Sequence, residues 1–307
     1  MSEPSRTVED NPYRLPRHVR PSRYELYLEP DLASRTFTGQ VTVSLEVMQQ
    51  TADIILNAAE LEILSASIEG PSGHRTEGRI TLQPDRERCL LRFPTTIKPG
   101  TWYLDLSFKG VLNDKLRGFY RSTYTEADGT KRTMAATQFE ATDARRAFPC
   151  WDEPDFKAVF GVTLAIDPGL TALSNAAVLS EGISSGKKLV RFADTILMST
   201  YLVAFLVGKL EGTQPVMVGK TPVRIWTVPG KQHLTRFGLD IAAYSLAFFS
   251  EYYGIPYPGD KLDLIAIPDF ASGAMENLGA ITFRETALLV DQTRATRSEQ
   301  ERVADVV

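Results

Sequence analysis

The strongest constraint on the fold is a strict alternation of apolar and polar side chains near the start of the chain. In residues 36–47 every second position is apolar or glycine, namely Phe37, Gly39, Val41, Val43, Leu45 and Val47. A period of two places these groups on one face of an extended strand. Residues 22–29 alternate in the same way. Both segments are therefore predicted as strands of a sheet with one buried face.

Shorter apolar runs extend this pattern over the first two-thirds of the chain. Gly, Pro, Asp and Ser turn signals separate them, and no long helical pattern intervenes. We expect further strands at residues 54–56, 62–68, 90–93, 102–109, 160–166, 188–192 and 202–211. Many short strands with this spacing predict a mainly β fold, with an antiparallel saddle or sandwich domain at residues 12–212. Residues 1–11 are expected to form a flexible N-terminus.

The pattern changes after residue 212, where a mixed α/β domain is predicted over residues 213–307. Apolar residues three or four apart predict a helix over residues 232–253, which Gly254 and Pro256 would end. The stripe that this helix would bury consists of Leu234, Phe237, Ile241, Tyr244, Phe248 and Tyr252. Strands are expected at residues 223–228, 262–267 and 280–283.

A second helix begins close to the end of the chain. Ser298 and Glu301 have the spacing of a capping box, and Val303 and Val306 begin an apolar stripe. An isolated helix needs about 12–15 residues to be stable, and the chain ends before that length is reached. We therefore expect the second domain to be incomplete, as the truncated start of a longer domain.

Composition and charge exclude several classes of partner. The chain has 34 Lys and Arg residues against 38 Asp and Glu residues, a net charge of −4, which disfavours nucleic acid. No apolar stretch reaches the roughly 20 residues that a membrane span needs, and the N-terminus has no apolar signal core. Two cysteines with no disulfide-like spacing suit a reducing compartment. A cytoplasmic protein without a membrane or nucleic-acid partner is predicted.

Two segments place charged residues among small or aromatic ones. Residues 137–154 read TQFEATDARRAFPCWDEP, and residues 273–277 read GAMEN. If Glu140 and Glu276 face one pocket, their carboxylates could clamp a cationic amine through charge-assisted hydrogen bonds. The remaining residues of the first segment are expected to be structural: Arg145 and Arg146 as partners of Asp143, Asp152 or Glu153, and Trp151 in the core.

Metal binding is not predicted from the residues of this chain. The only histidines are His18, His74 and His233, and none lies near a second ligand in sequence. The chain contains no His-Glu-x-x-His, Cys-x-x-Cys, Gly-x-Ser-x-Gly or phosphate-binding glycine motif. Taken from the residues alone, the chain is a two-domain protein with a possible acidic, amine-binding pocket.

Several sequence blocks together resemble the M1 family of zinc aminopeptidases, the gluzincins with a Gly-Ala-Met-Glu-Asn exopeptidase motif. Besides residues 137–154 and 273–277, the resemblance covers RHVRPSRY at 17–24, GFYRS at 118–122 and YYGIPYP at 252–258. The blocks occur in family order from about Asn11 onwards. The amino-acid sequence of residues 137–154 most resembles that of the puromycin-sensitive type.

The resemblance implies a saddle-like β domain followed by a thermolysin-like catalytic domain, and it assigns substrate-binding residues. Glu276 and Glu140 would bind the free α-amine of a peptide, and Gln138 would line the same first pocket. The backbone at Gly273 and Ala274 would pair with the peptide as an added strand. Met275 would form an apolar wall for the first side chain, and Asn277 completes the substrate-binding segment.

The resemblance also implies a zinc cofactor whose ligands are absent from this sequence. In the family the zinc motif, the general-base Glu and the oxyanion-stabilising Tyr follow the segment that matches residues 302–307. We therefore expect no catalytic and no metal-binding residue in this chain, and no activity without the missing C-terminal catalytic portion.

Three other functions remain open at this point. The chain could be a non-catalytic peptide- or partner-binding module, or one half of a split enzyme. A third alternative is the epoxide-hydrolase branch of the family, which has Gln-x-Gln and Gly-Gly-Met-Glu-Asn. Glu140 and Ala274 match the aminopeptidase pattern instead.

Overall fold

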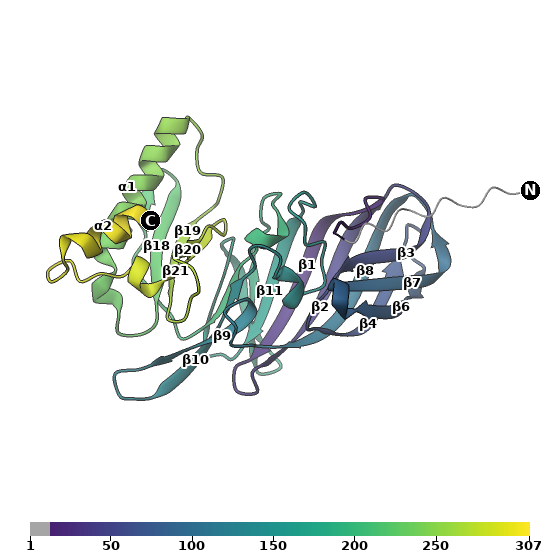
Figure 1. Cartoon of the computed structure of the whole chain (residues 1–307), viewed down its shortest axis with the longest axis horizontal. Helices are drawn as coiled ribbons and strands as arrows, with labels where there is room; N and C mark the ends of the chain where they lie inside the picture. The colour runs from purple at the N-terminus through teal and green to yellow at the C-terminus, as the bar shows by residue number, and fades with distance from the viewer. Residues whose placement is uncertain (1–12) are drawn as a thin grey trace, which may run out of the picture.

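The computed structural model describes residues 13–307, and the fold is mainly β, as the sequence predicts. The expected flexible segment 1–11 lies outside the described residues. An N-terminal part of three sheets is followed by a C-terminal part with one mixed sheet and two α-helices (Figure 1). The two parts follow one another along the longest axis of the molecule (Figure 1).

The largest sheet has eight strands in the order β13-β14-β11-β1-β2-β8-β4-β5. The predicted alternation is confirmed in β2 (Thr36–Val47), where every apolar position and Gly39 are buried and every polar position is exposed or partly exposed. The other strands are β1 (Val19–Asp31), β4 (Glu62–Glu69), β5 (Arg75–Glu77), β8 (Gly100–Val111), β11 (Val159–Ile166), β13 (Val178–Ser184) and β14 (Lys187–Phe192).

One strand pair of this sheet departs from the predicted antiparallel arrangement. β1 runs parallel to β11, with Arg23 opposite Val159 and Leu28 opposite Leu164. Parallel strands need a long crossover connection, which turn signals between neighbouring strands do not reveal. The pair is central to the core, because the rings of Tyr24 in β1 and Phe160 in β11 stack with centroids 4.8 Å apart.

Two smaller sheets complete the N-terminal part, in the orders β3-β7-β6 and β12-β15-β10-β9. Their strands are β3 (Thr51–Asn57), β6 (Arg79–Gln83), β7 (Arg88–Ile97), β9 (Gly118–Thr125), β10 (Lys131–Gln138), β12 (Thr171–Ser174) and β15 (Phe205–Gly208). The single strand expected at residues 202–211 is wrong. A 3-10 turn occupies its start, and the remainder divides between β15 and β16 (Glu211–Gly212), which belong to different sheets.

The C-terminal sheet has the order β16-β18-β19-β21-β20, with β17 (Val216–Val218) also paired to β18. The three predicted strands are confirmed as β18 (Thr221–Thr227), β19 (Leu262–Ile267) and β21 (Ala280–Arg284). These three run parallel to one another, whereas β20 (Ala274–Met275) runs antiparallel to β21. The short strand β20 therefore lies at the edge of a mixed sheet.

The helix expected at residues 232–253 is present as α1 (Arg236–Tyr253), after a 3-10 turn at Gln232–Leu234. The face that it buries differs from the expected one. Its buried residues are Gly238, Leu239 and Ala242, whereas Tyr244 and Tyr252 are 67% and 70% exposed. The helical period was correct, but the aromatic residues lie on the outer face.

Small residues explain why α1 turns this face to the sheet. A Cβ at Gly238 would lie only 2.7 Å from the carbonyl oxygen of Leu288, so the helix approaches its neighbours through a residue without a side chain. On the outer face the rings pack against one another instead. Phe248 stacks with Tyr244 and Tyr252, at centroid distances of 6.0 and 5.8 Å.

The second helix is α2 (Arg297–Val306), and its capping box is not the predicted one. Thr296 is the N-cap: its hydroxyl accepts from the Glu299 N–H at 3.3 Å, and the Glu299 carboxylate accepts from the Thr296 N–H at 2.8 Å. Glu301 pairs with Arg297 instead. The capping side chains thus lie two residues earlier than expected. Across residues 13–307, no helix is both long and apolar enough to cross a bilayer.

Three further 3-10 turns connect elements of the described chain. They are formed by Pro84–Arg86, Ala144–Arg146 and Glu285–Ala287. The turn at Ala144–Arg146 lies inside the first predicted functional segment, directly after β10. It therefore carries two arginines to the junction between the sheets of the N-terminal part.

Candidate functional site

The two predicted substrate-binding segments come from the two parts of the molecule. Gln138 is the last residue of β10, and Glu140 follows it, whereas residues 273–277 contain the edge strand β20. A buried cluster joins these elements, because Met275 of β20 shares it with Tyr120 of β9 and Ala136 of β10. The fold therefore brings the neighbourhoods of both segments to one junction.

Glu140 and Glu276 are both exposed, and each lies just beyond the end of its strand. Neither carboxylate has a hydrogen bond or an ion pair with any residue of the described chain 13–307. The peptide bond between Glu140 and Ala141 is cis. Binding of one amine by both carboxylates stays a prediction.

Gln138 provides a second kind of free group. Its side chain is almost fully buried, at 8% exposure, and its Oε1 atom has no hydrogen-bond partner within residues 13–307. Buried side-chain oxygens are normally hydrogen-bonded, because an unpaired one loses its hydration without compensation. Gln138 Oε1 is therefore a buried acceptor for which the described residues supply no donor.

The backbone of residues 273 and 274 is accessible along one edge. β20 pairs only with β21, through Ala274 opposite Phe283 and Met275 opposite Thr282. The Gly273 carbonyl accepts from the Arg284 N–H at 2.9 Å. Gly273 is exposed, and a Cβ there would meet no atom closer than 3.8 Å. The opposite edge of β20 has no strand partner in the described chain.

Met275 and Asn277 are buried, each with 1% exposure. Met275 belongs to the cluster that joins the two parts, and Asn277 donates from Nδ2 to the Thr282 hydroxyl at 3.2 Å. Both side chains therefore fix the backbone on either side of Glu276. The assignment of Met275 to the wall of a substrate pocket stays a prediction.

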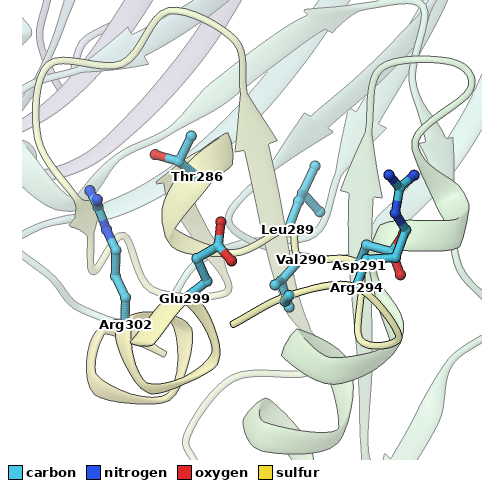
Figure 2. A pocket seen from close by; sticks show the side chains of 8 residues that line it. Thr286, Leu289, Val290, Asp291, Arg294, Glu299 and Arg302 are labelled. Atoms are coloured by element: carbon cyan, nitrogen blue, oxygen red, sulfur yellow. The ribbon is translucent and has the colours of Figure 1, made fainter. Parts of the chain in front are cut away.

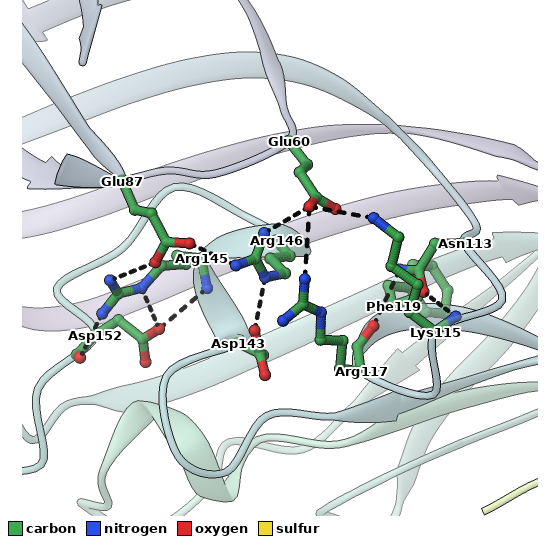
Figure 3. Close-up of polar contacts among 10 residues, drawn as sticks. All are labelled: Glu60, Glu87, Asn113, Lys115, Arg117, Phe119, Asp143, Arg145, Arg146 and Asp152. Atoms are coloured by element: carbon green, nitrogen blue, oxygen red, sulfur yellow. Dashed lines mark hydrogen bonds and ion pairs between the residues drawn. The ribbon is translucent and has the colours of Figure 1, made fainter. Parts of the chain in front are cut away.

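The arginines of the first segment form an ion cluster rather than a ligand site (Figure 3). Arg145 pairs with Asp152 at 2.9 Å and Arg146 pairs with Asp143 at 2.6 Å, as predicted. Glu153, the third predicted partner, instead receives hydrogen bonds from other arginines, Arg14 and Arg17. The structural role expected for the two arginines is confirmed.

Two glutamates that the sequence did not single out complete this ion cluster. Glu87 bridges both arginines, 3.1 Å from Arg145 and 2.5 Å from Arg146, and Glu60 lies 2.8 Å from Arg146 (Figure 3). Both come from distant turns, so no local spacing pointed to them. Burial raises the pKa of the Asp152 carboxyl, and the charge and hydrogen bonds of Arg145 oppose that rise.

Sequence reasoning also missed the contact that joins the two parts next to β20. Asp269, in the loop before β20, accepts at one carboxylate oxygen from the Ser122 hydroxyl at 3.1 Å and from the Thr123 N–H at 2.8 Å. The Asp269 N–H donates to the Ser122 hydroxyl oxygen at 3.0 Å, and the Tyr120 hydroxyl donates to the Asp269 carbonyl at 3.0 Å. Burial raises the Tyr120 pKa, and the Asp269 charge adds to it.

A separate pocket of about 580 Å³ lies beside α2 (Figure 2). It is lined by Thr286, Leu289, Val290, Asp291, Arg294, Ala295, Glu299 and Arg302. None of the predicted substrate-binding residues lines it. Asp291 and Glu299, its two acidic residues, are already engaged by the hydroxyls of Thr293 and Thr296.

Metal-binding side chains are not grouped in the described part of the chain. Among residues 13–307, no set of three or more His, Cys, Asp or Glu side chains is arranged to hold a metal ion.

Comparisons with known proteins give matches along nearly the whole chain. The model for the Peptidase M1 N-terminal domain matches residues 20–202, and the model for the Peptidase family M1 domain matches residues 237–307. Aminopeptidase M1-A from Oryza sativa subsp. japonica is 47% identical over 298 residues, and Aminopeptidase M1 from Arabidopsis thaliana is 45% identical over 298 residues. Each alignment covers 96% of this chain and 34% of the relative.

A third relative is the puromycin-sensitive aminopeptidase from Caenorhabditis elegans. It is 43% identical over 297 residues, which are 96% of this chain and 31% of the relative. The chain thus spans about a third of the length of the curated relatives that it matches.

Proposed function

This chain belongs to peptidase family M1, and on that basis we propose that its junction recognises the free N-terminal amine of a peptide. The whole protein would be a zinc aminopeptidase that removes single residues from the N-termini of peptides. The 307 residues would supply the recognition part of that enzyme, organised as a domain at residues 12–212 and a second one starting at residue 213.

The observation that carries this proposal is the pair of exposed, unpartnered carboxylates on Glu140 and Glu276. An α-ammonium group has three N–H donors, so it can satisfy two carboxylates and one amide oxygen at once. The unpaired Oε1 of Gln138 suits the third position. A peptide held by its terminal amine can present only its first peptide bond to the reaction, which accounts for single-residue removal.

The open edge of β20 supports the second element of recognition. A peptide that adds as a strand next to Gly273 and Ala274 would gain main-chain hydrogen bonds that do not depend on its sequence. Recognition would then combine a fixed amine anchor with sequence-independent backbone pairing. This combination suits an enzyme that acts on many peptides.

Zinc is the cofactor that the family implies, and the described residues do not fit it. They include no group of three or more candidate ligands, and a catalytic zinc needs three protein ligands besides its water. The proposal is that peptide hydrolysis needs metal ligands outside these 307 residues, so that this chain alone is inactive.

A cytoplasmic location is part of the proposal and is supported by the cysteines. Cys89 and Cys150 are both free and buried, which suits a reducing compartment. One relative, Aminopeptidase 2 from Saccharomyces cerevisiae, is named as mitochondrial, so the compartment has to be measured by fractionation.

The runner-up is a non-catalytic peptide-binding module, or one half of a split enzyme. It is favoured by the same observation, that the recognition residues stand without metal ligands among the described residues. Assaying aminoacyl-arylamide hydrolysis with added zinc, alone and with a separately expressed C-terminal portion, separates the possibilities. Zinc-dependent turnover by the chain alone would overturn the proposed inactivity.

The amine anchor is tested by isothermal titration with a free-amine tetrapeptide and its N-acetylated form. We expect binding of the free amine only, and a loss of about tenfold to a hundredfold for Glu140→Gln or Glu276→Gln, because each removes a charged hydrogen bond. Glu46→Gln, at another exposed carboxylate on β2, is the matched control. Equal affinity for the acetylated peptide would refute the anchor.

A further inference from the structure

Asp269 begins the loop that precedes β20 in the C-terminal part, and it connects this loop to β9 of the N-terminal part. Both hydrogen bonds to its carboxylate end on the same oxygen, from the Ser122 hydroxyl and the Thr123 N–H. The Asp269 N–H donates back to the Ser122 hydroxyl, so the two residues bond reciprocally. Ser122 is fully buried, at 0% exposure. We call this arrangement the Asp269 clasp.

The clasp links the two elements that lead to the carboxylates of the site. On one side, Ser122 of β9 is paired with Met134 of β10, the strand that ends just before Glu140. On the other side, the loop that begins at Asp269 leads directly into β20 and Glu276. The hold of this loop against β9 thus contributes to the relative position of the two carboxylates, beside the packing of Met275 in the cluster that joins the two parts.

A second set of contacts holds the same loop within the C-terminal part. The guanidinium of Arg284 donates to the carbonyls of Phe270, at 3.1 Å from Nε, and of Ala271. These bonds keep the loop on its own sheet, but they do not fix it relative to β10. Only a contact across the two parts can do that.

Other cross-part hydrogen bonds join the N-terminal part to the chain before residue 269 and after Glu276, including one from the Ala177 N–H to the Asp260 carboxylate at 3.0 Å. The Lys261 ammonium bridges the carbonyls of Ser174, at 2.8 Å, and Gly279, at 2.6 Å. The Asn175 amide donates to the carbonyl of Leu278 at 2.8 Å. The two parts therefore stay joined without the clasp, and its loss frees the start of the loop, whereas Met275 and Leu278 keep their own contacts with the N-terminal part.

We propose that Asp269 is a positioning residue, which acts through the clasp to set the spacing between Glu140 and Glu276. This inference rests on the proposed amine recognition and deepens it. When two carboxylates are held at one separation, both acceptors are already in position before the ammonium group binds, so no ordering cost is added on binding. A pair with variable separation has to be ordered at each binding event, so it binds more weakly.

The structural part of the proposal is tested by hydrogen exchange of the backbone amides in residues 270–276. Asp269→Ala is expected to speed their exchange about tenfold to a hundredfold, because hydrogen bonds to a charged group are lost. Amides of β1 and β2 should be unchanged. Asp114→Ala removes an exposed ion pair with Arg121 of β9 and is the matched control. Unchanged exchange in residues 270–276 would overturn the clasp.

The positioning role is tested by the same peptide titration as the anchor. Asp269→Ala should weaken free-amine binding about tenfold, and the further effect of Glu276→Gln should shrink in the double variant, because the two changes act on one arrangement. Asp269→Asn keeps an acceptor oxygen for Ser122 and Thr123, and it should restore binding. The positioning role would be contradicted if the affinity losses of Asp269→Ala and Glu276→Gln were fully additive, or if Asp269→Asn bound the peptide as weakly as Asp269→Ala.

The two readouts separate failure of this inference from failure of the proposed function. If the wild-type chain binds no free-amine peptide, the amine anchor is wrong, and hydrogen exchange still decides whether the clasp holds the loop. If the peptide binds and Asp269→Ala changes neither exchange nor affinity, the anchor stands and the positioning role is wrong.

Discussion

Gly279 faces the backbone carbonyl of Asn175 across the junction of the two parts, so closely that a Cβ on Gly279 would lie 2.0 Å from that oxygen. Gly279 also has a φ of +75°, a backbone conformation that side chains disfavour. It is the second residue after Asn277, in the turn between β20 and β21. The contact explains why the motif residues are followed by a glycine at this position.

Replacing Gly279 by alanine should therefore disrupt the junction. We expect Gly279→Ala to lower the free energy of unfolding by about 3 kcal/mol or more, from backbone strain and overpacking together. Gly254→Ala is the control, because Gly254 has a φ of +64° with no atom within 4 Å of a Cβ, and it should cost only about 1 kcal/mol. Urea unfolding measures both, and equal losses would contradict the steric argument.

Removing one partner of the ion cluster should be costly because Asp152 is buried. The side chain of Asp152 is 1% exposed, and that of Arg145 is 11% exposed. Arg145→Ala would leave an uncompensated charge and should destabilise the protein by about 3–5 kcal/mol. Arg92→Ala, which breaks an exposed pair with Asp53, should cost about 1 kcal/mol or less.

A double variant tests whether the unpaired charge of Asp152 causes this loss of stability. Adding Asp152→Asn to Arg145→Ala removes the buried charge and should recover part of the lost stability. Guanidinium unfolding at pH 7 measures all three variants. If the double variant is no more stable than Arg145→Ala, the loss does not come from the unpaired carboxylate.

The two faces of α1 should respond differently to truncation. Leu239 is buried, so Leu239→Ala should lower the free energy of unfolding by about 2–5 kcal/mol, because a cavity forms in the core. Phe248 is 45% exposed and contacts mainly other rings, so Phe248→Ala should cost about 1 kcal/mol or less. Thermal unfolding measures the loss of stability in each variant. A larger loss for Phe248→Ala than for Leu239→Ala would mean that α1 buries the aromatic face expected from the sequence.

Both thiols should be unreactive in the folded protein. Burial raises the pKa of Cys89 to about 12 and raises the pKa of Cys150 as well. A raised pKa means less thiolate at a given pH, about one part in ten thousand for Cys89 at pH 8. Ellman's reagent should therefore detect neither thiol in the native chain and both in guanidinium. Rapid native labelling would show that these sites open.

The sequence predicted elements well where burial has a local period. β2 was predicted with its correct bounds because each buried position alternates with a polar one. β13 was missed because all of its residues are exposed, so no alternation marks it. In α1 the period was visible, but small residues make the contact, and apolar character alone pointed to the larger side chains on the other face.

The residues of the candidate site likewise include some that the sequence indicated and some that it did not. Glu140 and Glu276 stood out because they are charges among small or aromatic neighbours. Glu87 and Asp269 could not be identified, because their partners Arg146 and Ser122 are distant in sequence and no spacing relates them. Local patterns thus indicated the residues that face outward, and the contacts that hold them in place required the folded chain.

The parallel pairing of β1 with β11 has a consequence for synthesis on the ribosome. Arg23 emerges long before its partner Val159, and at ordinary translation rates the delay is on the order of ten seconds. Throughout that interval one edge of β1 lacks its neighbour, and Tyr24 lacks the ring on which it stacks. The nascent chain therefore exposes an unpaired strand edge, open to pairing with other chains, until β11 has left the exit tunnel.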